Sequence, residues 1–274
     1  MKATFKLSFA VLSCALAFAA PAKADQLADV KARGTLVCGV LSNLEPFGFQ
    51  DPSSRELVGY DVDFCKGVAK ALGVKPELKV VSLEARIPEL SQGRVDILAA
   101  VLGYTQARAE QITFSDSYFV SEQKLAVKGN SSYKQRDDLA GKRISTIKGS
   151  STQNFLQKTL PTAQLVSYDD APSAFMALVQ SKVDGFGLSE TMLRRFIAKA
   201  GPAGNIQVIT PALGEEAWGL GIKKGEPGLE KAVNAALMDM EKSGEAQQIF
   251  DKWLGPKTMY QMKREFRVQP INKG

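Results

Sequence analysis

The chain has 274 residues, of which 45% are hydrophobic, and its formal net charge is +6 at pH 7. This length permits one large domain or two of ordinary size, with enough apolar residues for a proper core, so disorder is not indicated. Histidine is absent from the sequence, which excludes Ser-His-Asp catalysis, Cys-His catalysis and ordinary zinc sites.

Residues 1–24 have the pattern of a removable secretory signal. Lys2 and Lys6 precede a largely apolar run over residues 7–20, and residues 22–24 read Ala-Lys-Ala, an A-x-A cleavage site. The run is too short for a permanent membrane span, so we expect a soluble, exported protein. Cleavage removes three lysines and no acidic residue, which lowers the formal charge from +6 to +3. That mild charge gives no reason to expect a nucleic-acid partner.

The cysteines fit an exported protein. Cys14 lies within the expected signal, and attachment of a lipid there is an alternative, although Leu12 stands where lipoprotein signals prefer a small residue. The two remaining cysteines, Cys38 and Cys65, are an even number in a compartment where disulfides persist. We therefore predict a bridge between them, with two buried free thiols as the alternative.

The first half of the chain alternates strands and helices. The helix over residues 60–73 shows apolar residues at helical spacing, with Asp61 or Asp63 as its N-cap and Gly73 as its stop. Together with its neighbours it gives a β-α-β-α-β order, which favours a parallel sheet covered on both faces. The other elements expected here are strands over 35–40, 78–83 and 95–101 and a helix over 87–93.

The same order of elements begins again after residue 142. "QSKVDGFGL" at 180–188 repeats the pattern of "QGRVDIL" at 92–98, which indicates two similar α/β units in tandem. The second unit is expected to contain strands over 143–148, 163–167 and 183–188, and helices over 151–159, 172–180 and 190–200.

Two extended connectors, residues 122–130 and 215–225, separate the units, and two amphipathic helices at 228–244 and 246–254 still need an apolar surface to cover. The first unit is the simplest partner for them, so the chain should cross twice between two Rossmann-like lobes through a two-strand hinge. We expect an α/β fold in which residues 25–122 and 220–274 form lobe 1 and residues 123–219 form lobe 2. A ligand cleft should lie between the lobes, near the carboxyl ends of the parallel strands.

Arg108 lies just beyond the third strand of the first unit, at the mouth of the expected cleft. An arginine there can hold a carboxylate through two parallel charge-assisted hydrogen bonds, and a turn at Gly103 lets backbone groups approach the ligand. In the second unit, Gly149, Ser150 and Ser151 stand between a strand and a helix start, where free N–H groups suit an anion. We predict that both features grip one carboxylate and couple binding to closure. Taken singly, a surface arginine and a plain N-cap are the alternatives.

These elements resemble the polar amino-acid group of periplasmic solute-binding proteins, the extracytoplasmic receptors of ABC importers. The resemblance spans nearly all of the chain after residue 24 and rests on "GTLVCGV", "LVGYDVDFCKGVAKALG", "TQARAEQITFSDSYF", "DDLAGKRISTIKGSST" and "FDKWLGP". It implies the type II periplasmic binding protein fold, a location in the periplasm, and a small carboxylate-bearing ligand, with an amino acid as the favoured choice. It also implies an ABC permease in the inner membrane as partner, a monomer, and no cofactor or metal.

The resemblance assigns roles to particular residues. The family's arginine at the position of Arg108 binds the ligand α-carboxylate, and the residue matching Ser151 donates a backbone N–H. Arg86 matches an arginine that acidic-amino-acid binders use on the side-chain carboxylate, which gives a modest preference for a glutamate-like or aspartate-like ligand. Against this, another arginine of those binders is replaced by Leu41. The alternative for Arg86 is an exposed helix start. Further pocket positions of the family correspond to Leu44, Leu83, Val101 and Gly103.

The sequence departs from the family where the ligand ammonium is received. An aspartate usually ends the relevant strand of the second lobe, whereas this chain has Ser189 followed by Glu190, and the side-chain hydroxyl common at the position of Gly103 is also missing. A serine cannot pair with a buried ammonium, and an unpaired buried charge is costly. Either Glu190 or Glu45 takes over this role, or the ligand lacks the α-amino group.

The resemblance also implies that a bridge between Cys38 and Cys65 ties a strand to a helix in the first lobe. A competing class of function is a lyase or dehydratase built on the same binding scaffold. Such an enzyme would use Glu45 or Glu190 as its general acid and Arg108 as the substrate anchor. The sequence contains no complete phosphate-binding or dinucleotide-binding motif, so a binding protein remains the favoured interpretation.

Overall fold

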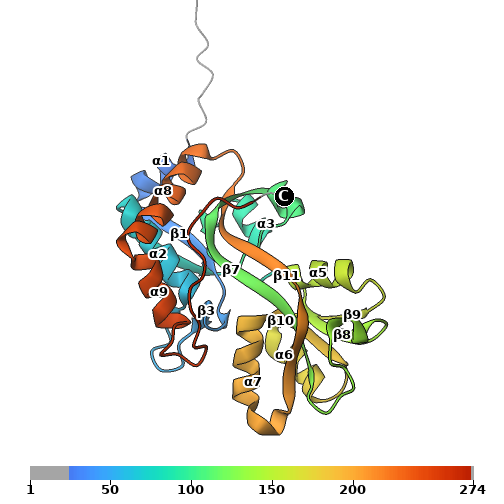
Figure 1. The fold of residues 1–274 in the computed structure, drawn as a ribbon. Coiled ribbons are helices and arrows are strands. Elements are labelled where there is room, and N and C mark those ends of the chain that lie inside the picture. The colour runs from blue at the N-terminus through green and yellow to red at the C-terminus, as the bar shows by residue number, and fades with distance from the viewer. Residues whose placement is uncertain (1–24, 273–274) are drawn as a thin grey trace, which may run out of the picture.

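The computed structural model describes residues 25–272 and shows an α/β fold of two lobes (Figure 1). The predicted secretory signal and Cys14 lie outside the described residues. One eight-stranded sheet runs through both lobes in the order β5-β1-β6-β11-β7-β10-β8-β9. Its two long strands, β7 (Ile112–Lys128) and β11 (Ile206–Lys223), pair with each other in antiparallel fashion and cross between the lobes.

The first lobe is built around β1, which pairs in parallel with β5 on one side and β6 on the other. A separate three-stranded sheet has the order β2-β3-β4. The elements of this lobe are α1 (Gln26–Arg33), β1 (Thr35–Val40), β2 (Asn43–Leu44), β3 (Gly48–Gln50), β4 (Leu57–Val58), α2 (Tyr60–Leu72), β5 (Lys75–Val80), α3 (Arg86–Ser91), β6 (Ile97–Leu98) and α4 (Gln106–Ala109).

The second lobe repeats this arrangement around β8, which pairs in parallel with β9 and β10. Its elements are a 3-10 turn, η1 (Arg136–Leu139), β8 (Arg143–Ile147), α5 (Ser151–Thr159), β9 (Gln164–Tyr168), α6 (Ala171–Val179), β10 (Gly185–Ser189) and α7 (Glu190–Gly204). The expected helix over 151–159 has these same bounds. The expected connectors are the long hinge strands β7 and β11.

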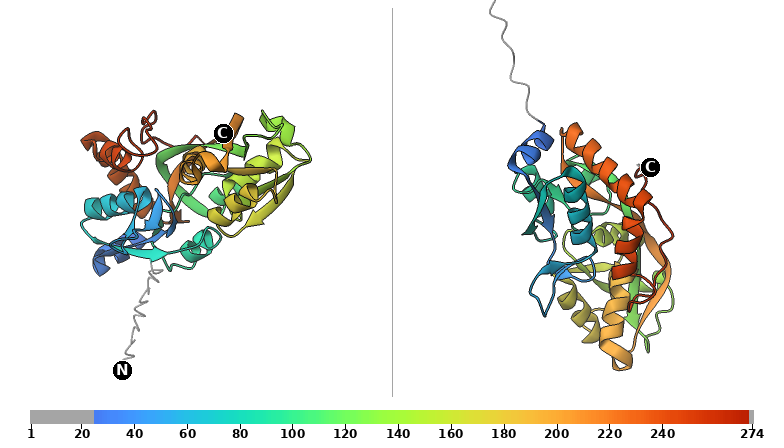
Figure 2. Two further views of the ribbon diagram at one scale, coloured as in Figure 1. Left: turned by 90° about the horizontal axis from the view of Figure 1, so that it is seen from below. Right: turned by 90° about the vertical axis from the view of Figure 1, so that its left-hand side faces the viewer.

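The two final helices return to the first lobe, as expected. α8 (Pro227–Ser243) and α9 (Glu245–Trp253) pack on α2, which Figure 2 shows from two further sides. Asp63 of α2 accepts hydrogen bonds from Lys252 Nζ and Trp253 Nε1, each at 2.7 Å. The C-terminal helices therefore stabilise the first lobe.

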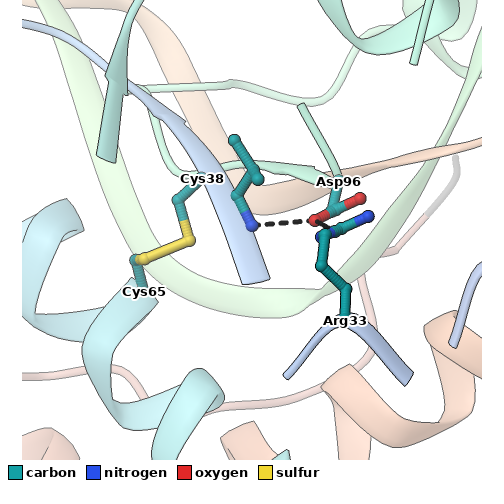
Figure 3. Close-up of a disulfide and its surroundings, with 5 residues drawn as sticks. Arg33, Cys38, Cys65 and Asp96 are labelled. Carbon is teal, nitrogen blue, oxygen red and sulfur yellow. Dashed lines mark hydrogen bonds and ion pairs between the residues drawn. A yellow bond between two sulfur atoms is a disulfide. The ribbon is translucent and has the colours of Figure 1, made fainter. Parts of the chain in front are cut away.

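The repeated Val-Asp pattern marks an equivalent position in the two lobes. Asp96 donates its N–H to the carbonyl of Val37 at 2.8 Å. Its carboxylate oxygen Oδ2 accepts the Val37 N–H, also at 2.8 Å (Figure 3). Asp184 forms the same pair of bonds with Arg143, at 2.8 and 3.0 Å. Each aspartate therefore fixes the chain beside the central strand of its own lobe.

Two expectations for the first lobe were wrong. The N-cap of α2 is Gly59 and makes no side-chain capping bond, because the Asp61 side chain is buried and binds elsewhere. The strand expected over 95–101 is regular only at Ile97–Leu98, because the chain then leaves the sheet toward the cleft. Gly73 ends α2 in the left-handed conformation, as predicted.

Candidate functional site

A cavity with a free volume of about 30 Å³ lies between the lobes. That is room for about two water molecules, so a larger ligand can enter only when the lobes move apart. Predicted site residues that line the cavity are Leu44, Leu83, Arg86, Val101, Ser150, Ser151 and Ser189. Gly103, Arg108 and Glu190 do not line it. Lining residues that the sequence interpretation missed are Gln123, Ile147, Thr152, Leu188, Met192, Glu216 and Trp218.

Arg108 reaches across the cleft from the short helix α4, where the Thr105 side chain accepts its N–H at 3.2 Å. Its guanidinium donates from Nη1 to the carbonyl of Gly103 at 2.7 Å, and from Nη2 to the carbonyl of Gly149 in the other lobe at 2.8 Å. The residue is 9% exposed. Because a guanidinium has five N–H donors, three remain without an acceptor among the described residues.

Arg86, at the start of α3, is more fully engaged than Arg108. Its guanidinium donates to four backbone carbonyls, those of Leu83, Ala100, Val101 and Gly149, at 2.7 to 3.1 Å. Burial lowers the pKa of Arg86, and the positive charge of Arg108 lowers it further. Arg86 thus holds the cavity wall of the first lobe and touches the second lobe, which differs from the exposed helix start considered as an alternative.

Val101 has a left-handed backbone conformation, with φ of +52°. For a β-branched residue this conformation costs roughly 1–2 kcal/mol, so neighbouring contacts must hold it. Asp61 Oδ2 accepts the Val101 N–H at 2.8 Å, and Tyr118 donates its hydroxyl to Asp61 Oδ1 at 2.7 Å. Burial raises the pKa of Asp61 to about 7, although both hydrogen bonds oppose the shift.

The second lobe contributes the N-terminus of α5. Ser150 is the N-cap, and its hydroxyl donates to the carbonyl of Ile147 at 2.7 Å and makes no capping bond. Ser151 is the first helical residue and is 7% exposed. The first N–H groups of a helix lack partners within the helix and carry its positive dipole end, so this end of α5 presents donors toward the cleft.

The three residues considered for an ammonium group lie in different surroundings. Ser189 lines the cavity, and its buried hydroxyl has no hydrogen-bond partner among the described residues. Glu190 turns away from the cavity and binds Lys124 and Arg194, at 2.5 and 2.6 Å. Glu45 forms an ion pair with Arg195 of α7. Neither glutamate is therefore placed to receive a ligand ammonium or to act as a general acid in the cavity.

Glu216 is the carboxylate that the sequence interpretation missed. It lines the cavity from β11 and is 6% exposed. Burial raises its pKa, whereas Ser151, Trp218 and the two arginines act in the opposite direction. The signal in the sequence is its place two residues before Trp218, since alternate residues of a strand share a face. A glutamate on the buried face of a strand is rare enough to indicate a site.

The structure contains a disulfide between Cys38 of β1 and Cys65 of α2, with Cα atoms 6.3 Å apart (Figure 3). Both residues are fully buried and neither lines the cavity. The bridge therefore joins strand to helix in the first lobe, away from the cleft.

Two features that would suggest other functions are missing from residues 25–272. No helix there is both long and apolar enough to cross a membrane. The described part of the chain also brings together no group of three or more histidine, cysteine, aspartate or glutamate residues placed to hold a metal ion.

Comparison with known proteins adds independent evidence. The bacterial extracellular solute-binding proteins, family 3, match residues 36–256. The ABC transporter glutamine-binding protein of Bacillus subtilis is 32% identical over 236 residues, which cover 85% of each chain. The glutamate/aspartate import solute-binding protein of Salmonella typhimurium is 28% identical over 256 residues, 88% of this chain and 84% of that one. An ancestral arginine-binding protein bound to arginine is 33% identical with a TM-score of 0.75, covering 81% of this chain and 99% of that one.

Proposed function

The chain belongs to the bacterial extracellular solute-binding proteins of family 3, and from this premise we propose that it captures one free amino acid between its lobes. It is a binding protein of an amino-acid ABC import system. The export signal, the periplasmic location, the permease in the inner membrane and the monomeric state are parts of the same proposal.

The observation that carries the proposal is the hydrogen bond between Arg108 of one lobe and the Gly149 carbonyl of the other, at 2.8 Å. When the lobes open, this bond breaks and the guanidinium loses its acceptor. The α-carboxylate of an amino acid can then take the place of that carbonyl and accept two parallel hydrogen bonds. The N–H groups at Ser151 reach the same carboxylate from the second lobe on closure.

Closure has to draw on both lobes, because a ligand that binds the open and closed states equally shifts no population. We assign residues 25–122 and 220–274 to lobe 1, residues 123–219 to lobe 2, and the hinge to β7 and β11. Leu44 and Leu83 form an apolar wall for the ligand side chain. A second cavity of about 190 Å³ adjoins this wall and shares Leu44, Leu83 and Ile147 with the first, which gives a longer side chain room toward the cleft mouth.

A finer part of the proposal is a modest preference for an acidic amino acid, because Arg86 adds a second positive charge to the cleft. Four of its five N–H donors already have backbone acceptors, which limits what it offers to a side-chain carboxylate. The preference predicts that Arg86→Ala weakens glutamate binding more than glutamine binding. Equal losses of affinity for glutamate and glutamine would contradict the acidic preference.

Isothermal titration calorimetry of the purified protein against the twenty common amino acids tests the proposal. We expect one-to-one binding of at least one amino acid, with a dissociation constant on the order of 1 μM, or about −8 kcal/mol. Arg108→Ala should weaken that binding roughly 100-fold or more. Arg94→Ala is the matched control, since Arg94 is half exposed and pairs with Glu89 within lobe 1. Binding of no amino acid, or equal affinity of the Arg108→Ala variant, contradicts the proposal.

A further inference from the structure

Glu216 is the only acidic side chain among the described residues that line the interlobe cavity. Its carboxylate is held firmly at one oxygen. Oε1 accepts hydrogen bonds from Trp218 Nε1 at 2.8 Å and from Gln123 Nε2 at 2.9 Å. The carbonyl of the Gln123 side chain accepts in turn from the Thr152 hydroxyl at 2.6 Å, so the orientation of the carboxylate is fixed from the hinge and from α5.

The other oxygen of Glu216 has no partner. Oε2 is buried and accepts no hydrogen bond from any described residue. Neither Arg86 nor Arg108 forms an ion pair with Glu216 within the described chain, although both arginines act electrostatically on this carboxyl. Ser151 also lies near enough to lower the pKa of this carboxyl. A buried carboxylate oxygen that accepts no hydrogen bond destabilises the folded protein, because its lost hydration is not replaced. A buried carboxylate oxygen without a hydrogen-bond donor, on a residue that lines the cavity, is suited to pair with an incoming cation.

Gly103 makes this placement possible. A Cβ atom at position 103 would lie 2.1 Å from Glu216 Oε2, so any larger residue there would displace the carboxylate. The carbonyl of the same glycine accepts from Arg108 Nη1 at 2.7 Å. Gly103 therefore contacts both the Arg108 guanidinium and the Glu216 carboxylate. The two charged groups thus meet at one glycine, and in an α-amino acid the carboxylate and the ammonium are likewise attached to a single carbon.

We propose that Glu216 Oε2 receives the ammonium group of the bound amino acid, beside the Arg108 carboxylate clamp, and that it selects zwitterionic ligands over acids without an amino group. The proposal rests on the function proposed above and names the residue that recognises the second charge of the ligand. It also gives Gly103 a role, which is to leave space for the acceptor.

The test compares ligands that differ only in the amino group. Three pairs are titrated calorimetrically into the purified protein: L-glutamine and 4-carbamoylbutanoate, L-glutamate and glutarate, and L-arginine and 5-guanidinopentanoate. For the wild type, the amino member of the pair that it binds should be favoured by roughly 100-fold. In Glu216→Gln this ratio should fall to within a few-fold of one, through weaker binding of the amino acid and unchanged binding of the acid.

Two further variants separate recognition from folding. Gly103→Ala should reduce the same ratio while Glu216 itself is retained, because the added methyl displaces Oε2. Glu215→Gln is the matched control, since Glu215 is exposed on the adjacent strand position and its variant should keep the wild-type ratio. Circular dichroism melting curves establish that each variant is folded.

The outcomes distinguish the two proposals. An unchanged ratio in Glu216→Gln overturns the role of Glu216 and leaves the function as an amino-acid binder intact. If Glu216→Gln weakens the binding of both ligands of a pair equally, the role of Glu216 is also overturned, because Glu216 would then support the Arg108 clamp or the fold. A wild type that binds none of the twenty amino acids removes the proposed function, and the role of Glu216 with it.

Discussion

Arg108 of the first lobe donates a hydrogen bond to the carbonyl of Gly149 in the second, at 2.8 Å. Arg86 donates to the same oxygen at 3.1 Å. A single backbone carbonyl therefore holds two buried guanidinium groups of the opposite lobe, and the structure is that of a closed conformation. Because Arg86 also supports three carbonyls of its own lobe, the two arginines should respond differently to substitution.

Arg86→Ala is expected to lower the free energy of unfolding by roughly 2–4 kcal/mol, because buried carbonyls lose their donor. Urea denaturation followed by circular dichroism measures this loss. Arg108→Ala removes fewer backbone contacts and should destabilise the protein less than Arg86→Ala. The reverse order would contradict the division between a supporting and a ligand-binding arginine.

Local signals in the sequence predicted much of the fold. α5 has the expected bounds, and Gly73 ends α2 as expected, because caps and stops depend on near neighbours. The lengths of β7 and β11 were missed. They depend on pairing between segments about a hundred residues apart, such as Glu216 with Ser121, and local composition carries no record of that register.

The same reason limited the prediction of the site. Arg108 and the start of α5 could be found because each follows a strand end. The choice of carboxylate was missed, because Glu190 follows the strand end where the family places its aspartate, whereas Glu216 lies within β11 and only its place two residues before Trp218 hints at a buried face. Glu190 meets Lys124 and Arg194 beside β7, whereas the register of β11 turns Glu216 into the cavity.

Glu45 and α7 form a second contact between the lobes. Glu45 pairs with Arg195, whose side chain is 13% exposed, and lies 3.5 Å from Lys199 Nζ. Opening of the cleft separates these charges, so Glu45→Gln should reduce amino-acid affinity by roughly threefold to tenfold at low salt. The difference from wild type should shrink at 0.5 M salt, where exposed charges are screened.

Calorimetry at two salt concentrations measures the effect of Glu45→Gln. Glu89→Gln is its control, because Glu89 pairs with Lys79 and Arg94 inside the first lobe. An equal loss of affinity in the control would show that the effect is not specific to closure.

Asp61 should make stability depend on pH. Burial raises its pKa to about 7 from an ordinary value of 3.8. The folded state therefore holds this proton more tightly than the unfolded state does. The stabilisation is complete below about pH 4 and is lost as the pH rises toward 7. Relative to Asp61→Asn, the wild type should lose roughly 2–3 kcal/mol between pH 5 and pH 8, since one pKa unit corresponds to about 1.4 kcal/mol.

Urea denaturation of both proteins at pH 5, 6, 7 and 8 gives this difference directly, and other titrating groups cancel in the comparison. The asparagine retains an oxygen for the Val101 N–H, so the variant should fold. A difference that is constant over this range, or that increases with pH, would show that Asp61 is ionised throughout.

The disulfide should contribute stability without affecting the ligand. Cys38 and Cys65 are 27 residues apart in the sequence, and closing a loop of this size stabilises a protein by roughly 3–4 kcal/mol through the unfolded state. Replacing both cysteines by alanine should therefore lower the unfolding free energy by about that amount. Because neither residue lines the cavity, the dissociation constant for the amino acid should stay the same.

Unfolding of the wild type in the presence of a reductant is the control, because both side chains are kept and only the covalent link is removed. Full stability of the reduced protein would contradict the prediction, as would a change in affinity of the double variant under conditions where it is folded.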